Sequence, residues 1–190
     1  NWDTWRKDVE GGKHSEAPPD KGYITSTVDE LVKAVLPDGT TTYRFILSTA
    51  AVDAHRDTIA VEGWDLVRYL ANPTVLWAHS YYTPPIGRAI EVGRTASALY
   101  AVDIFATQGI SPFADMIRGL VDDGLLKTVS VGFKPITWSY NEERRGVDFL
   151  TQELLEHSIV PVPSNPEAML LQAKNKGYDI DVNKLVALDD

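Results

Sequence analysis

The sequence of 190 residues contains no cysteine. This absence excludes disulfide bonds, thiolate metal sites and a cysteine nucleophile. No stretch approaches the roughly 18–20 consecutive apolar residues of a membrane-spanning helix, so we expect no membrane partner. Basic residues are also in the minority, because 18 Lys and Arg stand against 27 Asp and Glu. The net charge of −9 argues against nucleic acid as the main partner.

Motifs that bind cofactors are missing as well. No glycine-rich loop follows a strand-like segment, so the sequence predicts neither a nucleotide nor any other cofactor. Asp53, His55 and Asp57 lie close together, but their spacing matches no defined metal motif. We therefore predict a salt-bridged turn and no metal at this cluster, and keep a metal-dependent hydrolase as an alternative.

The composition fits one globular domain with extensions, since 44% of the residues are hydrophobic and 24% are charged. Residues 1–22 are polar and rich in glycine, proline and charge, which predicts a flexible N-terminal arm. The folded domain is expected over residues 23–173. Residues 174–190 are weakly patterned and are predicted to form a C-terminal extension.

Within the domain, short strands alternate with a few helices. The strands are predicted over residues 43–52, 74–79, 86–92, 97–106, 128–138 and 147–160. The helices are predicted over residues 28–36, 63–70, 111–124 and 164–174. This order favours an α+β domain resembling a β-barrel over a doubly wound parallel sheet.

Three polar residues stand inside or at the end of apolar, strand-like runs: His79, Ser130 and Glu156. Polar groups are costly to bury, so their placement needs a reason. Alternation puts Ser130 and Gly132 on the face opposite Val129, Val131 and Phe133, and Gly132 leaves space for a substrate backbone. A hydroxyl, a histidine and a carboxylate can form a nucleophile–base–acid relay. On pattern alone, a purely structural role for Ser130 and His79 stays open.

The third member of such a relay is ambiguous. Glu156 and His157 are adjacent, so alternation places them on opposite faces of a strand and only one of them can orient His79. Leu154, Ser158 and Val160 share the face of Glu156, whereas Leu155 and Ile159 share the face of His157. The pattern does not decide between the two.

Four motifs surround these residues in a specific order and spacing. The first motif comprises Gly63-Trp64, Tyr69-Leu70, Asn72-Pro73 and Val75-Leu76 before His79, and the second is Pro85-Ile86-Gly87-Arg88. The third comprises Gly124-Leu125-Leu126-Lys127 and Val129-Ser130-Val131-Gly132-Phe133. The fourth comprises Leu155-Glu156, Ser158-Ile159-Val160, Val162-Pro163-Ser164-Asn165-Pro166 and Ala168. In these motifs, roughly over residues 43–170, the sequence resembles the tailed-phage prohead (capsid maturation) serine proteases.

The resemblance implies a small, mostly antiparallel β-barrel flanked by a few helices, similar to the herpesvirus assemblins. It also implies a serine endopeptidase with Ser130 as nucleophile, His79 as general base and Glu156 as the acidic third member. Position 157 is usually apolar in this family, and the assemblins use a second histidine, so His157 is the alternative third member.

Members of the family cleave the scaffold, or the scaffolding arm of the capsid protein, and themselves. The resemblance therefore implies a site of action inside the immature capsid in the cytoplasm of a bacterial host, and a homodimer or higher oligomer is compatible with it. A different class remains open: a non-enzymatic capsid-assembly or scaffold module that keeps the fold without cleaving.

Overall fold

The structure is a computed structural model that describes residues 4–5, 7–8, 11, 22–27, 32–53 and 55–162. The predicted helix over 164–174, the predicted extension over 174–190 and most of the predicted arm lie outside the described residues. One described residue of the arm, Trp5, is buried, and its ring meets Trp138 edge-on with 5.3 Å between ring centroids.

The described strands form one ten-stranded sheet, in the order β1-β9-β10-β6-β7-β8-β3-β2 with β4 and β5 paired to β10. The strands are β1 (Gly22–Thr27), β2 (Val32–Val35), β3 (Thr41–Thr49), β4 (Thr58–Ile59), β5 (Trp64–Asp65), β6 (Thr74–Trp77), β7 (Gly87–Arg94), β8 (Ala98–Phe105), β9 (Thr128–Asn141) and β10 (Gly146–Val160). The helices are η1 (Val61–Gly63), α2 (Val67–Ala71) and α3 (Pro112–Asp122).

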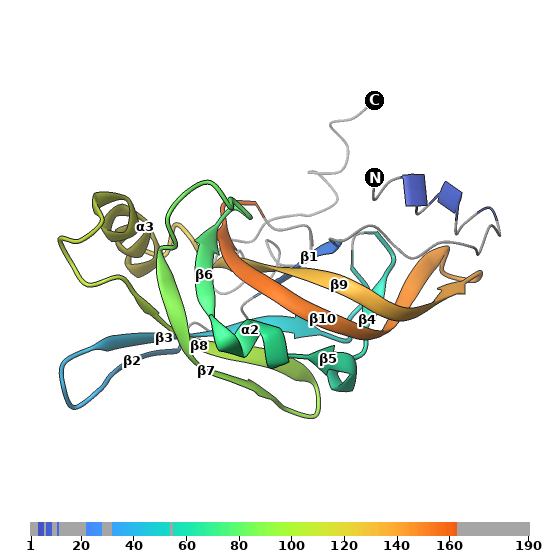
Figure 1. Ribbon diagram of the computed structural model, residues 1–190, viewed down its shortest axis with the longest axis horizontal. Helices are drawn as coiled ribbons and strands as arrows, with labels where there is room; N and C mark the ends of the chain where they lie inside the picture. The colour runs from blue at the N-terminus through green and yellow to red at the C-terminus, as the bar shows by residue number, and fades with distance from the viewer. Residues whose placement is uncertain are drawn as a thin grey trace, which may run out of the picture.

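Strand β10 organises the sheet because it is long enough to pair along both edges. One edge pairs antiparallel with β9, and the other pairs in turn with β4, β5 and β6, all parallel. In Figure 1, β6 stands between β10 and β7, and so joins the half of the sheet that contains β9 and β10 to the half that contains β7, β8 and β3.

The α+β class predicted from the sequence is confirmed, but the predicted closure into a barrel is wrong. Strands β1 and β2 end the hydrogen-bonded order, and no backbone pairing joins them in the described part of the chain. Alternating hydrophobicity shows which strands are half buried. It does not show whether the two edges of a curved sheet meet in register, which closure requires.

The six strands predicted from residue 43 onward correspond to β3 and β6–β10, with ends that differ by a few residues. The predicted helix over residues 28–36 is wrong in its described part, because Val32–Val35 forms β2 and pairs antiparallel with β3. A short apolar run does not distinguish a helix from a strand. The turn that follows this run favours the strand, because it reverses the chain so that β2 can pair with β3. In this turn Gly39 has a φ of 86°, and Asp38 accepts a hydrogen bond from the Thr40 N–H at 2.9 Å.

Two of the predicted helices, over residues 63–70 and 111–124, lie entirely within the described residues, and they agree with the structure to different degrees. The helix predicted over 111–124 is α3, where Ser111 Oγ accepts the Ala114 N–H at 3.2 Å and Pro112 occupies the first turn. The segment predicted over 63–70 divides into η1, β5 and the shorter helix α2. Gly63 lies so close to β10 that an added Cβ would be 1.9 Å from the Leu150 carbonyl oxygen.

The core lies against the inner face of β9 and β10. Phe133 is at its centre, in edge-on contact with Trp64 and Phe149 at centroid distances of 5.7 and 5.2 Å. Val129 and Val131 are buried with it, so this face of β9 is apolar, as the alternation predicts.

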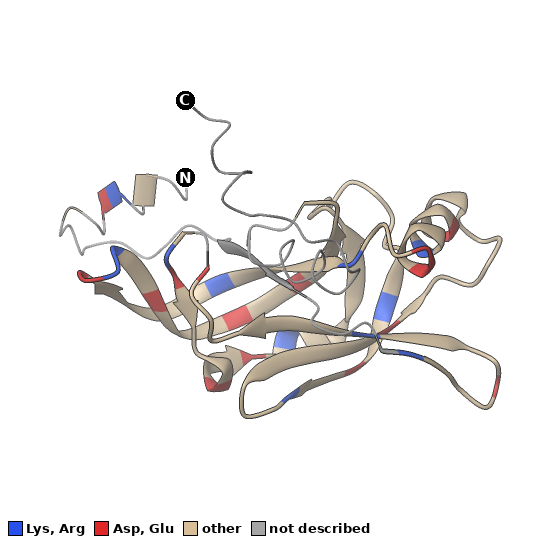
Figure 2. Cartoon of the chain, turned by 180° about the vertical axis from the view of Figure 1, so that it is seen from behind, with Lys and Arg blue, Asp and Glu red and all other residues tan. Residues whose placement is uncertain are grey.

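Charged side chains are spread over the described elements, with Lys and Arg interspersed among Asp and Glu (Figure 2). No helix in the described ranges is long and apolar enough to cross a membrane.

Candidate active site

His79 lies in a tight turn directly after β6. Ala78 and His79 have φ angles of 48° and 58°, in the left-handed region that side chains other than glycine rarely adopt. Such a conformation costs about 1–3 kcal/mol per residue and persists where neighbouring structure holds it. Strand β10 supplies that support: the Ala78 N–H donates to the Ile159 carbonyl at 3.0 Å and the His79 N–H donates to Ser158 Oγ at 3.0 Å.

A β-bulge in β10 sets the faces of Glu156 and His157. Leu154 pairs with Phe133, but Glu156 pairs with Gly132, so Leu155 is an extra residue with no opposite partner. Because of this insertion, Leu154 packs in the core while Glu156 faces away from it. The simple alternation, which placed Leu154 and Glu156 on one face, fails at this point.

The structure brings the predicted trio together. His79 Nε2 lies 2.8 Å from Ser130 Oγ, and His79 Nδ1 lies 2.7 Å from Glu156 Oε1. Ser130 and Glu156 are buried, whereas the His79 side chain is 21% exposed. The three residues come from β9, the turn after β6 and β10, which are adjacent only in the folded chain.

The hydrogen bonds of His79 to Glu156 and Ser130 determine which ring nitrogen of His79 carries the proton. An ionised carboxylate only accepts, so His79 Nδ1 must donate to Glu156. In the neutral imidazole this leaves Nε2 with a lone pair, which accepts the hydroxyl proton of Ser130. The carboxylate therefore selects the tautomer that a general base next to a serine requires.

The Glu156 carboxylate lies between Ser158 and Gly132. Its second oxygen, Oε2, accepts a 2.7 Å hydrogen bond from Ser158 Oγ. On the other side, a Cβ added at Gly132 would lie 2.3 Å from Oε1. The prediction that Gly132 leaves space for a substrate backbone is wrong, because the Glu156 carboxylate occupies that space.

His157 points to the opposite face and contacts neither His79 nor Ser130 in the described hydrogen bonds. Its Nε2 lies 2.8 Å from Asp103 Oδ2, and its Nδ1 lies 2.8 Å from the Tyr69 hydroxyl oxygen. Burial alone would lower the pKa of His157, but the Asp103 carboxylate and the more distant Glu156 outweigh it and raise the pKa above its ordinary value. Tyr69 can accept from the imidazolium because its own O–H reaches the Thr74 carbonyl at 3.4 Å.

Burial, with Asp103 and Glu156 nearby, also raises the pKa of Tyr69, so the phenol keeps its proton. Tyr69, His157 and Asp103 thus form a second buried polar network behind the first. An acidic residue within the apolar run of β8 was the sequence signal for Asp103, and it was missed. Ser158 was missed too, although its i, i+2 spacing from Glu156 is the signal for a shared face.

The cluster at residues 53–57 forms a hydrogen-bonded turn. Asp53 Oδ1 accepts the N–H groups of His55 and Asp57, each at 2.8 Å, and Asp57 Oδ1 accepts the Val147 N–H at 2.7 Å. Among the described residues, no group of three or more His, Asp or Glu side chains is arranged to hold a metal ion. These carboxylates therefore serve loop geometry in the described structure.

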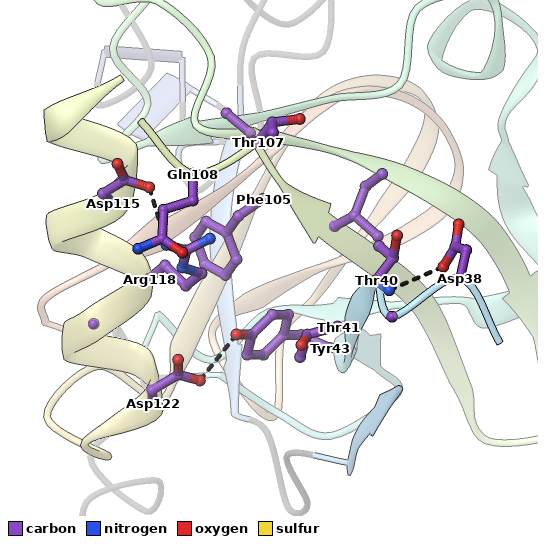
Figure 3. A pocket seen from close by; sticks show the side chains of 14 residues that line it. Asp38, Thr40, Thr41, Tyr43, Phe105, Thr107, Gln108, Asp115, Arg118 and Asp122 are labelled. Atoms are coloured by element: carbon purple, nitrogen blue, oxygen red, sulfur yellow. Dashed lines mark hydrogen bonds and ion pairs between the residues drawn. The ribbon is translucent and has the colours of Figure 1, made fainter. Parts of the chain in front are cut away.

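A groove of about 710 Å³ lies elsewhere, between α3 and the β2–β3 turn (Figure 3). Its acidic side chains have partners: Asp122 accepts from Tyr43 at 2.9 Å and pairs with Lys33 at 2.7 Å. Asp115 pairs with Arg118 at 3.0 Å. None of His79, Ser130 and Glu156 lines this groove.

An imidazole that joins a buried hydroxyl to a carboxylate is the arrangement of the serine hydrolases. Known proteins resemble this chain in sequence and in fold. Over 176 residues the chain is 29% identical to the prohead protease of Escherichia phage T5. The matched region covers 90% of this chain and 80% of that protein. No protein-family model matches the chain.

The fold is similar to the solved structure of the capsid assembly protease gp21 of bacteriophage T4. The TM-score is 0.58 at 10% sequence identity, over 76% of this chain and 98% of the T4 chain. The resemblance to the tailed-phage prohead proteases predicted from the sequence is confirmed.

Proposed function

We propose that this protein is a serine endopeptidase of phage capsid maturation. Its substrates are the scaffold or the scaffolding arm of the capsid protein, and its own chain, inside the immature capsid. The likeness to the T5 prohead protease supports a peptidase with capsid proteins as substrates. The observation that carries the serine mechanism is the continuous chain of hydrogen bonds from Ser130 through His79 to Glu156.

In the proposed first half-reaction, Ser130 Oγ attacks the scissile carbonyl carbon while its proton passes to His79 Nε2. The Glu156 carboxylate stabilises the resulting imidazolium. The imidazolium then donates the proton to the departing amine nitrogen. The C–N bond breaks and an ester joins the acyl group to Ser130.

In the second half-reaction, water attacks the ester and His79 again accepts the proton. The carboxylic product leaves and Ser130 regains its proton from His79. N–H donors aimed at the developing oxyanion complete the chemistry, and each is worth about 3 kcal/mol in comparable enzymes. Because Ser130 is fully buried and the imidazole is partly exposed, we expect the peptide to approach along His79.

The test is co-expression with the capsid and scaffold proteins of the same phage, with cleavage followed by intact mass. Ser130→Ala and His79→Ala should each reduce cleavage by about 1,000-fold or more. Two exposed residues of the same types provide matched controls: Ser97→Ala and His55→Ala should cleave like the unmodified protein. Full activity in the Ser130 or His79 variant would refute the mechanism.

The third member is tested separately. Glu156→Gln keeps the size of the side chain but no longer enforces the tautomer, so it should reduce cleavage strongly, whereas His157→Gln should act mainly on stability. The opposite result would move the role to His157. A fluorophosphonate probe distinguishes the non-enzymatic assembly module, because that module would leave Ser130 unlabelled while the protease forms a covalent adduct at this residue.

A further inference from the structure

Ser158 is a buried polar residue beside the relay of Ser130, His79 and Glu156. It lies in β10 directly opposite Ser130 of β9, so the two side chains share one face of the sheet. Ser158 is fully buried, and a hydroxyl in such a position requires partners.

The partners of Ser158 belong to the relay. Its Oγ accepts the backbone N–H of His79 at 3.0 Å and donates its proton to Glu156 Oε2 at 2.7 Å. One hydroxyl therefore touches both the main chain of the base and the carboxylate that orients the base.

We propose that Ser158 is a positioning residue for the relay, which acts by fixing His79 and Glu156 relative to each other. This inference rests on the proposed function. The hydroxyl ties the left-handed turn at Ala78 and His79 to β10, next to the bond that Ile159 makes with Ala78. Its hydrogen bond to Oε2 also opposes rotation of the carboxylate away from His79, and the carboxylate fills the space beside Gly132 that a Cβ would otherwise take.

Removal of the hydroxyl should misplace the imidazole without unfolding the sheet. Ser158→Ala leaves Glu156 Oε2 and the His79 N–H without this partner, and hydrogen bonds to a charged group carry enough free energy for a loss of about 10- to 100-fold. We expect the loss in kcat of capsid-protein cleavage and in the rate of fluorophosphonate labelling at Ser130, with KM little changed.

Ser48 provides a matched control. It is a buried serine in β3 of the same sheet, and its Oγ has no hydrogen-bond partner within the described residues. Ser48→Ala therefore removes an equivalent buried hydroxyl that positions nothing and should label and cleave like the unmodified protein. Circular dichroism and urea unfolding establish that both variants are folded.

A double-mutant cycle separates positioning from a merely structural role. If Ser158 acts through Glu156, the effect of Ser158→Ala should shrink to about threefold or less in a Glu156→Gln background; independent roles would multiply. If Ser158→Ala does not fold, Ser158→Cys, which keeps the volume with a weak donor, takes its place in the cycle.

The outcomes separate the two proposals. Full activity in Ser158→Ala, or effects that multiply in the cycle, with Ser130→Ala inactive, would overturn the positioning role alone. Full activity in Ser130→Ala would overturn the proposed function and the positioning role together.

Discussion

Gly132→Ala offers the sharpest test of the site geometry. The new methyl carbon would lie 2.3 Å from Glu156 Oε1 and 3.0 Å from its Cδ. An ordinary van der Waals contact of a Cβ begins at about 3.4 Å, so the carboxylate oxygen must move by about 1 Å. Glu156 is 2% exposed and has little space to move. The same oxygen holds His79 Nδ1 at 2.7 Å, and a misplacement of about 1 Å in a catalytic group costs about 100-fold in rate.

The assay is kcat/KM for cleavage of the capsid protein, together with urea unfolding. We expect a fall of about 100-fold in kcat/KM and a loss of about 1–3 kcal/mol in the free energy of unfolding from overpacking. Gly119→Ala is the matched control, because a Cβ added there meets nothing within 4 Å. It should keep full activity and gain about 0.5–1 kcal/mol in helix stability. Unchanged kcat/KM in a folded Gly132→Ala protein would refute the reasoning.

Three further predictions concern the free energy of unfolding, and a fourth concerns metal dependence of cleavage. The pKa of His157 is raised above 6.5 in the folded state, so its contribution to the free energy of unfolding is fully present below about pH 6.5 and is lost as pH rises through the folded-state pKa. Urea unfolding at several pH values should show this decline, and His157→Gln should lack it. Ser111→Ala removes the cap of α3 and should cost about 1 kcal/mol in thermal unfolding, and a neutral result would contradict the capping role. Asp57→Ala leaves the buried Val147 N–H without its partner and should cost about 1–3 kcal/mol, while EDTA should not reduce cleavage; inhibition by EDTA would instead favour a metal site.

Local sequence patterns predicted much of the described fold. The capping serine and the proline at the start of α3, and the alternation of Val129, Val131 and Phe133, act through neighbouring residues, so they are readable without the fold. The wrong predictions of a helix over residues 28–36 and of a closed barrel share a cause, because both depend on strand pairing that local patterns do not show. Whether residues 32–35 become a helix or a strand depends on their pairing with β3, and closure of the sheet depends on edges that are distant in sequence.

At the candidate site, too, the local sequence determined one part and the tertiary structure determined another. The sequence by itself determined the types of group available: a histidine, a serine and a carboxylate in apolar runs, with no cysteine to compete. Only the tertiary structure decided which carboxylate or imidazole faces His79, because the bulge at Leu155 shifts the faces of β10 by one residue. Alternation has a period of two, so one inserted residue reverses every assignment beyond it. The same shift directs His157 to Asp103 and leaves Glu156 and Ser158 beside His79.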